Sequence, residues 1–193
     1  MNLHDAILSR RTIYDFDASQ PVSPEVLSRA LESARWGQNH KLTQPWRFVV
    51  VGPQGRQRLA KKLLALMLAK LDGQAAGVAD ARRVKAQEKA DQLAALPALL
   101  VVAMQRTPGD LLREREDYAA VATAVQNLSL SLWADGVGMQ WGTGEITRDP
   151  EAYAVCGFDP QREEIVGFLK VGVPATIPQG RREPLDTIVR HVP

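Results

Sequence analysis

The side chains best suited to holding a ligand gather in one polar loop, residues 37–44. The loop concentrates amides, an imidazole and an ammonium group: Gln38, Asn39, His40, Lys41 and Gln44. Trp36 stands just before it and Trp46 just after it. Such groups can hydrogen-bond the edges of a planar heteroaromatic ligand. The alternative is an ordinary helix–strand connection with a polar surface, and the local sequence leaves both interpretations open.

A second candidate site lies near the N-terminus, where Arg10 and Arg11 are followed by Thr12. Guanidinium groups match phosphate oxygens bidentately, and a threonine hydroxyl adds a neutral hydrogen bond. The run therefore indicates an anion site. The alternative is that both arginines only stabilise the negative end of a helix dipole, because they stand where a helix runs out.

Other catalytic patterns are missing from the sequence. It has no G-x-G-x-x-G, G-x-x-x-x-G-K-[ST] or G-x-S-x-G run. Its three histidines, His4, His40 and His191, are far apart, and no carboxylate spacing indicates a metal site. Cys156 lies among apolar residues and is interpreted as a packing residue. We therefore expect no catalytic side chain and no metal, so that a cofactor carries the chemistry.

The composition indicates one globular domain, residues 1–193, with 45% hydrophobic and 24% charged residues. The net charge is only +2, and basic residues are scattered among acids, which argues against a nucleic-acid partner but not against an anionic small ligand. No window approaches the roughly 20 apolar residues of a membrane span, and the first residues lack the apolar core of a secretory signal. With a single cysteine, these features predict a cytoplasmic protein without a membrane partner.

Periodic and apolar segments predict the elements that must position these groups. Asn2 caps a first helix, and Ser23 with Pro24 begins a second one. Strands are expected at 46–52, 98–104, 137–141 and 165–171, and helices at 59–70, at 111–134 and from Asp149 to Gly157. The face of the 111–134 helix is apolar and mostly small, which suits a central helix or a subunit interface. The polar segment 72–96 is interpreted as a helical excursion or lid.

Three local expectations concern the loop and the tail. Pro45 should push Gln44 towards an extended conformation. The run from Phe48 to Val51 is apolar at every position, so this strand should be buried on both sides. The tail, residues 175–193, is too polar to fold alone and has a strand-like run at 187–189, so it should lie across this subunit or a second one. Because several helices precede the first strand, the expected fold class is α+β.

Four segments, in this order, make the chain resemble the nitroreductase family of FMN-dependent, NAD(P)H-oxidising enzymes, in its small single-domain bacterial branch. They are the helix leading into Arg10-Arg11-Thr12; Asn39-His40-Lys41 with Gln44-Pro45-Trp46; the helix from Asp117 through Gln126-Asn127 to Gly136; and Trp141-Gly142-Thr143-Gly144 followed by 167–174. Together they span nearly the whole chain except 72–96. Each segment is weak alone, whereas their order and spacing are specific.

The resemblance implies a three-layer fold in which helices flank a central, mainly antiparallel sheet. It also implies an obligate homodimer with FMN bound at the interface and a C-terminal tail extended across the dimer. Arg10, Arg11 and Thr12 would contact the flavin phosphate, ribityl chain or pyrimidine edge, Trp141, Gly142 and Thr143 would line the isoalloxazine, and Arg181 or Arg182 would neutralise phosphate.

Trp36 and His40 would, by the same resemblance, reach the flavin bound mainly by the other subunit. Larger members of the family have Ser-Ser-x-Asn where Gln38-Asn39-His40-Lys41 stands. That difference leaves open whether Asn39, His40 or Gln44 makes the flavin contact in this chain. Thr12 replaces the commoner serine and keeps the hydroxyl.

The implied activity is the reduction of a small-molecule acceptor, such as a nitroaromatic or a quinone, by NAD(P)H through FMN in a ping-pong cycle. One alternative is a specialised flavin enzyme of the same family, for example of the dehalogenase type. An apolar lid would favour it, whereas segment 72–96 is polar. Another alternative is a non-catalytic flavin-binding protein, which steady NAD(P)H oxidation would distinguish from an enzyme.

Overall fold

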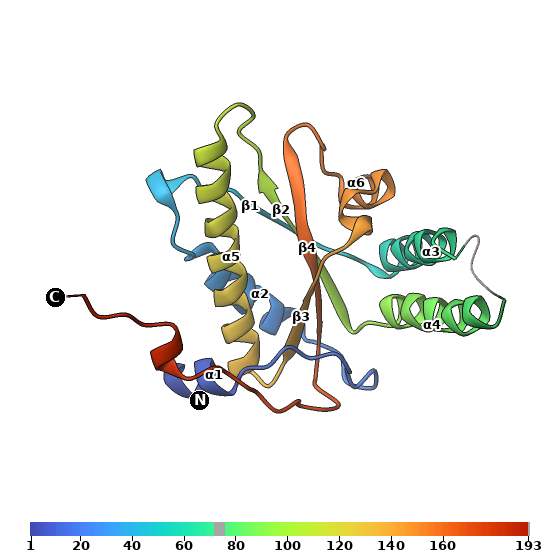
Figure 1. Cartoon of the computed structure of the whole chain (residues 1–193), viewed down its shortest axis with the longest axis horizontal. Helices are drawn as coiled ribbons and strands as arrows, with labels where there is room; N and C mark the ends of the chain where they lie inside the picture. Colours follow the sequence, from blue (N-terminus) through green and yellow to red (C-terminus); the bar gives the residue numbers. More distant parts are fainter. Residues whose placement is uncertain (72–75, 193) are drawn as a thin grey trace.

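A four-stranded antiparallel sheet forms the middle layer of the computed structural model, which describes residues 1–71 and 76–192. Its spatial order is β1-β2-β4-β3, with every neighbouring pair antiparallel: β1 (Trp46–Val50), β2 (Ala98–Gln105), β3 (Gly138–Gly142) and β4 (Glu163–Gly172). Helices cover both faces (Figure 1). The predicted α+β class, with an antiparallel sheet flanked by helices, is confirmed, and the four strands lie where the sequence placed them.

On one face of the sheet lie α1 (Leu3–Ser9), α2 (Pro24–Arg35) and the long α5 (Leu111–Ala134) (Figure 1). The predicted caps are present, because the Asn2 side chain accepts from the Asp5 N–H at 2.9 Å and Ser23 accepts from the Val26 N–H. The inner face of α5 buries small and branched residues that pack on the sheet and on α2: Ala120, Val121, Ala124, Val125, Leu128 and Leu132. This helix therefore carries the larger core.

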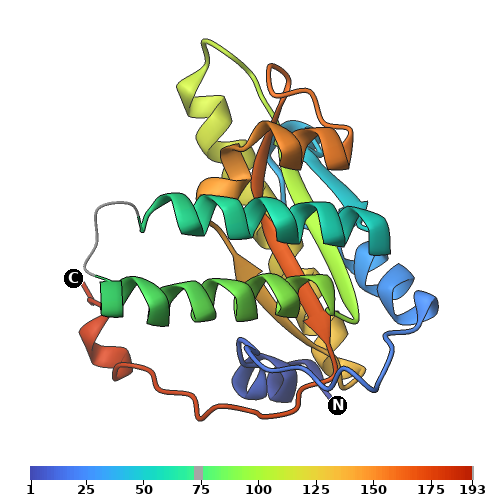
Figure 2. The same cartoon turned by 90° about the vertical axis from the view of Figure 1, so that its right-hand side faces the viewer.

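On the other face lie α3 (Pro53–Ala69), α4 (Ala76–Ala94) and α6 (Pro150–Cys156). α3 and α4 run side by side in opposite directions (Figure 2), and α4 buries Ala79, Ala86, Ala90 and Leu93. The predicted excursion at 72–96 corresponds to α4, while its residues 72–75 lie outside the described part of the chain. Whether α4 covers a site stays a prediction. Among the described residues, no helix is both long enough and apolar enough to cross a membrane.

The strand β1 corrects one expectation. It pairs only with β2 among the described residues and is an edge of the sheet. Its side chains are not fully buried on both sides, because Phe48 and Val49 are only half-buried. Val50 is 51% exposed, and Val51, just beyond the strand, is buried. The apolar run marked a strand correctly, but composition does not distinguish an edge strand from a central one.

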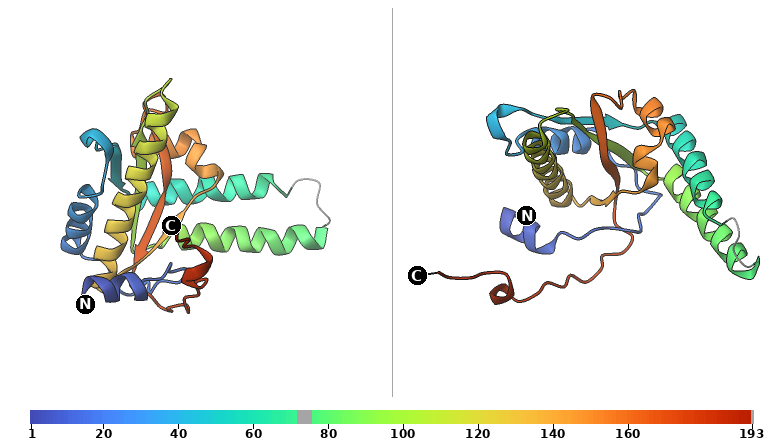
Figure 3. Two further views of the ribbon diagram at one scale, coloured as in Figure 1. Left: turned by 60° about the vertical axis from the view of Figure 1, so that its left-hand side comes forward. Right: turned by 45° about the horizontal axis from the view of Figure 1, so that its top comes forward.

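The C-terminal tail differs from a second expectation. After β4 the chain continues in extended form, first past Asp15 and Arg11 and then away from the body (Figure 3), and residues 175–192 are exposed. The strand-like run at 187–189 is not a strand, because Leu185–Thr187 forms a short 3-10 turn, η3. A strand needs a neighbour to pair with, and no described strand lies beside this run. The placement of the tail across a second subunit stays a prediction, and Pro193 lies outside the described residues.

Candidate functional site

The arginine cluster consists of Arg10, Arg11 and Arg182, which the fold brings together from α1 and the tail. Burial, followed by the charges of Arg182 and Arg11, lowers the pKa of the half-buried Arg10 guanidinium. Among the described residues, no carboxylate forms an ion pair with any of the three. Three cations without a counter-charge form a site that favours an anion.

The two predicted arginines of the N-terminal run differ in their surroundings. Arg11 Nη1 donates to the Leu8 carbonyl at 2.8 Å and to the Arg10 carbonyl at 2.9 Å, so for this residue the helix-end interpretation also holds. The Arg11 guanidinium lies so close over Gly180 that a Cβ there would overlap it. Gly180 thus lets the tail pass against Arg11 and brings Arg182 beside Arg10. Arg181 is exposed and offers its carbonyl to Arg182 Nη1 at 2.7 Å.

The arginine cluster adjoins the β3 edge of the sheet. Thr12 forms a bridge with Met139 of β3, and the Ile13 N–H donates to the Met139 carbonyl at 3.1 Å. Ile13 is fully buried beneath this junction. The sequence-predicted run Arg10-Arg11-Thr12 therefore lies alongside the strand that ends in Trp141, Gly142 and Thr143, and these two predicted groups share one edge of the molecule.

The end of β3 offers free hydrogen-bond donors. The N–H groups of Thr143 and Gly144 are exposed and donate to no acceptor among the described residues. Gly144 has φ 143°, a backbone conformation that favours glycine. The indole of Trp141 packs against the core beneath α5, with Nε1 3.4 Å from the Val166 carbonyl. Gly142 leaves the opposite face of the strand bare, which gives a flat backbone surface.

The loop between α2 and β1 is closed by its own asparagine. Asn39 Oδ1 accepts from the Gln44 N–H at 3.0 Å, and Asn39 Nδ2 donates to the Gly37 carbonyl at 3.1 Å. Lys41, Leu42 and Gln44 have φ of 52°, 55° and 44°. The expectation of an extended Gln44 is therefore wrong, because the hydrogen bond to Asn39 accompanies a left-handed turn that outweighs the preference imposed by Pro45. Left-handed backbone at non-glycine residues costs about 1 kcal/mol or more each.

A buried acid of α5 holds this strained loop in place. Asp117 is 3% exposed; its Oδ1 accepts from Thr43 Oγ1 at 2.6 Å and its Oδ2 from Arg113 Nε at 2.9 Å. Thr123 Oγ1 also donates to the Gln38 carbonyl at 3.0 Å. Asp117 was not among the site residues predicted from the sequence. The available signal was a carboxylate that stands four residues after an arginine and in line with the apolar face of a helix.

The structure does not bring the loop and the arginine cluster together within one chain. The loop is fastened to α5 at Asp117, whereas α1 meets α5 near its other end, where Trp133 Nε1 donates to Ser9 Oγ at 2.8 Å. These two points are about 24 Å apart along the helix, at about 1.5 Å per residue. His40 and Gln44 are exposed, and Trp36, at the end of α2, is 73% exposed.

Cys156 is buried against α3 and the sheet, as the sequence predicted, and burial raises the pKa of its thiol to about 11. A thiol with such a pKa stays protonated at neutral pH and is a poor nucleophile. In residues 1–71 and 76–192, no three histidine, cysteine, aspartate or glutamate side chains lie close enough together to hold a metal ion.

Comparison with known proteins decides the family. The sequence model of the nitroreductase family matches residues 7–173. The chain belongs to the nitroreductase family. One relative of this chain is YfhC of Bacillus subtilis, whose name assigns it provisionally as an NAD(P)H nitroreductase. The two are 30% identical over 181 residues, which cover 93% of this chain and 88% of YfhC.

Solved structures agree with the fold of this chain. A nitroreductase-like family protein from Bacillus cereus superimposes with a TM-score of 0.80 at 26% identity, covering 100% of this chain and 96% of that one. Iodotyrosine deiodinase, solved with FMN and 3-iodo-L-tyrosine, gives a TM-score of 0.76 at 22% identity over 100% of both chains. The second likeness establishes a shared fold and nothing finer.

Proposed function

We propose that this protein is an FMN-dependent oxidoreductase that uses NAD(P)H to reduce nitroaromatic, quinone or similar acceptors. The observation that carries the proposal is the arginine cluster, which no described carboxylate pairs and which adjoins β3, the strand that ends in the free N–H groups of Thr143 and Gly144. Family membership supports it, as do the NAD(P)H nitroreductase name of YfhC and the FMN held by iodotyrosine deiodinase.

The donor set fits FMN. Arg10 and Arg182, with Arg11 behind them, would hold one phosphate through charge-assisted bonds, and the Thr12 hydroxyl would add a neutral one. The cluster is compact, as one phosphate requires, and the sequence lacks a dinucleotide fingerprint, which favours FMN over FAD. The N–H groups of Thr143 and Gly144 would donate to the edge of the ring, and the bare backbone at Gly142 would support its plane.

When bound, FMN would supply the redox chemistry, taking a hydride from NAD(P)H and delivering electrons to the acceptor. The protein's part is to hold, orient and shield the ring. No side chain of this chain needs to act as nucleophile or acid. Because no separate dinucleotide fold is available for NAD(P)H, nicotinamide and acceptor would use one open face in turn, which is a ping-pong cycle. An open face of this kind selects acceptors by their shape and electron affinity, so it should discriminate only modestly between acceptors.

The proposal requires a homodimer. Within one chain the loop 37–44 is remote from the arginine cluster, so Asn39, His40 and Gln44 would serve the site of a second copy. Trp36 lies closer, in a hollow that it shares with Asn2 and Leu3 at the start of α1, and it would reach the second copy's flavin from there. The exposed tail and the open edge of β1 are further surfaces that a second copy would cover. Light scattering at low micromolar concentration should give twice the 21.2 kDa mass of the chain. A flavin-loaded monomer would contradict this part of the proposal.

The deciding experiment is the visible spectrum of the purified protein, followed by mass identification of the released cofactor. Oxidised flavin absorbs blue light, so a colourless protein that gains no absorbance with added FMN, or one that releases FAD, would overturn the cofactor assignment. Steady NAD(P)H oxidation with an acceptor would separate an enzyme from a flavin carrier. Parallel double-reciprocal lines are expected when both substrates are varied, and intersecting lines would indicate a ternary complex instead.

A further inference from the structure

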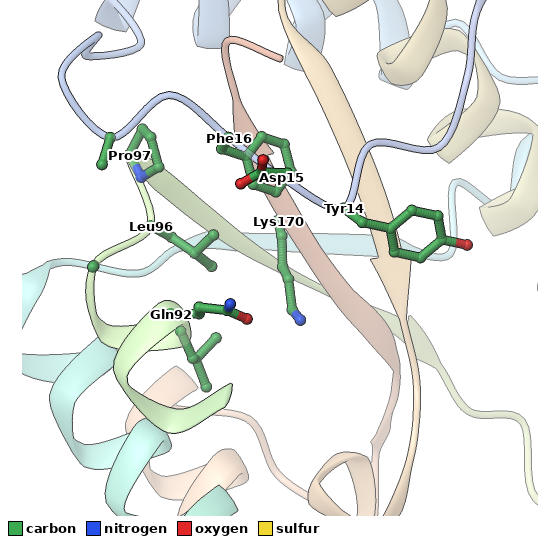
Figure 4. A pocket seen from close by; sticks show the side chains of 10 residues that line it. Tyr14, Asp15, Phe16, Gln92, Leu96, Pro97 and Lys170 are labelled. Atoms are coloured by element: carbon green, nitrogen blue, oxygen red, sulfur yellow. The ribbon is translucent and has the colours of Figure 1, made fainter. Parts of the chain in front are cut away.

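A small pocket lies between the segment after Thr12, the end of α4 and strand β4 (Figure 4). Its volume is about 120 Å³, and we name it the Lys170 pocket after the side chain that extends into it. Its walls are mainly apolar or aromatic and include Tyr14, Phe16, Leu96 and Pro97. Two polar side chains, Asp15 and Gln92, also line it. A cavity of about 150 Å³ in a protein core accommodates benzene, so this pocket matches a single ring-sized group.

Lys170 is an unusual residue for its position. It stands in the otherwise apolar run from Ile165 to Val171 and is half-buried. Among the described residues it forms no hydrogen bond and no ion pair, and Asp15, the acid that also lines the pocket, is exposed. Burial, followed by the charge of Lys89, lowers the pKa of its ammonium group. A partly desolvated cation without a counter-charge is unfavourable, and a bound anion would compensate it.

The Lys170 pocket adjoins the candidate flavin site. Lys170 pairs directly with Gln140 of β3, and Phe168 pairs with Gly142. Directly opposed residues, and residues two apart along a strand, share one face of a sheet. Lys170 therefore lies on the same face as the bare backbone at Gly142. Tyr14 follows Thr12 by two residues, so the segment that bridges to β3 continues into the wall of the pocket.

We propose that the Lys170 pocket is a subsite for the carboxylate or phenolate oxygen of an aromatic substrate. The apolar walls would hold the ring, Lys170 Nζ would bind the oxyanion, and the Gln92 amide would supply a further donor. The inference rests on the proposed function for its choice of substrate. The other source of an oxyanion, the FMN phosphate, has the three arginines to hold it, which is why we assign this pocket to the substrate.

The test compares charged and neutral probes on the purified protein. Benzoate and benzamide have the same ring and differ in charge, and calorimetry measures both without requiring turnover. The unmodified protein should bind benzoate more tightly than benzamide. Lys170→Met, which keeps the length of the side chain but removes its charge, should weaken benzoate about ten- to a hundredfold and leave benzamide unchanged. Lys170→Arg should retain most of the preference, and Lys85→Met, an exposed lysine of α4, is the matched control.

Kinetics provide the second arm. With Lys170→Met, the KM for para-nitrobenzoate should rise about as much as benzoate binding weakens, while the KM for nitrobenzene stays constant. Equal affinity of the unmodified protein for benzoate and benzamide would overturn the proposal, and this comparison needs no variant. If Lys170→Met instead loses FMN and keeps its benzoate affinity, the anion is the cofactor's phosphate and the substrate assignment is wrong. A protein that binds benzoate through Lys170 but never binds FMN would refute only the function proposed above.

Discussion

The arginine cluster and the loop 37–44 are both polar, yet they are built in opposite ways. The cluster joins α1 and the tail beside β3, and leaves three positive charges without a carboxylate partner among the described residues. Several polar groups of the loop already have partners within the chain: Asn39 closes the loop, and Asp117 of α5 holds it in place. Three of its residues adopt left-handed backbone. The cluster is therefore suited to bind an anionic ligand. The loop is instead a rigid surface, suited to contact the flavin site of a second copy.

The largest effect should follow from removing a charge of the cluster. Arg10→Ala takes away the half-buried guanidinium that makes no capping bond, and losing such a partner of a desolvated anion costs about 2–5 kcal/mol of binding. The variant should purify mostly colourless, as measured by the ratio of flavin to protein absorbance. Arg83→Ala, an exposed arginine of α4 paired with Asp80, is the matched control and should stay yellow. Full flavin occupancy in both Arg10→Ala and Arg11→Ala would show that these arginines only stabilise the end of α1 and do not bind the cofactor.

Mixing two defective proteins tests whether the arginine cluster and the loop side of one flavin site come from different chains. Arg10→Ala damages the cluster, and the double variant Trp36→Ala with His40→Ala damages the loop side. If each flavin site takes its cluster from one chain and its loop side from the other, a mixed dimer contains one intact site. Unfolding and refolding the two variants together in equal amounts should restore about a quarter of the flavin sites. Each variant refolded alone is the control, and no recovery in the mixture would mean that both regions serve the same chain's site.

Removing the anchor of the loop should lower the stability of the protein. Asp117→Ala leaves the Thr43 hydroxyl and the Arg113 guanidinium without their acceptor, and an unsatisfied, partly buried donor costs about 1–3 kcal/mol. The free energy of unfolding in urea should fall by that amount. Asp91→Ala on α4 is the control, because the Asp91 side chain is exposed and, among the described residues, accepts only from Gln87. An unchanged midpoint for Asp117→Ala would show that the loop holds its shape without this anchor.

The smallest effect should come from the tail, where Gly180 lies under Arg11. Gly180→Ala places a methyl group on the guanidinium and must displace it. Because Arg11 also has two carbonyl acceptors, only part of its contribution should be lost, and FMN affinity should fall about two- to tenfold. Gly77→Ala, with nothing within 4 Å of the added Cβ, is the control in the titration. An unchanged FMN affinity of Gly180→Ala would show that the tail at Gly180 does not contribute to the arginine cluster.

Local features of the fold could be predicted because they depend on neighbours in sequence. Asn2, Ser23 and Pro24 mark helix starts through bonds that span three residues, and apolar runs mark the four strands. The order of family segments then gave the architecture. Gln44 was mispredicted because the preference imposed by Pro45 is local, whereas the bond to Asn39 comes from five positions away.

The remaining features depend on contacts between distant segments. Asp117 meets Thr43 across 74 positions, and nothing near either residue indicates the other. Lys170 was visible as a charge within an apolar strand, but its lack of a partner becomes evident only once α4 and the segment after Thr12 surround it. The predicted site residues lie in regions that one chain keeps apart, which is why we propose that a second chain completes the site. The residues were named from the sequence, and the homodimer was predicted only from the family resemblance.

The open edge of β1 makes a lone chain vulnerable to aggregation. Its outer row of N–H and C=O groups has no strand beside it among the described residues, and Val50 adds an exposed apolar side chain. Such an edge can template strand addition by any neighbouring molecule. Arg47, exposed on this strand and bonded to Gln105, places one charge there against that outcome. For the proposed homodimer, conditions that separate the subunits should therefore turn concentrated solutions cloudy, so a loss of solubility would accompany the loss of flavin colour.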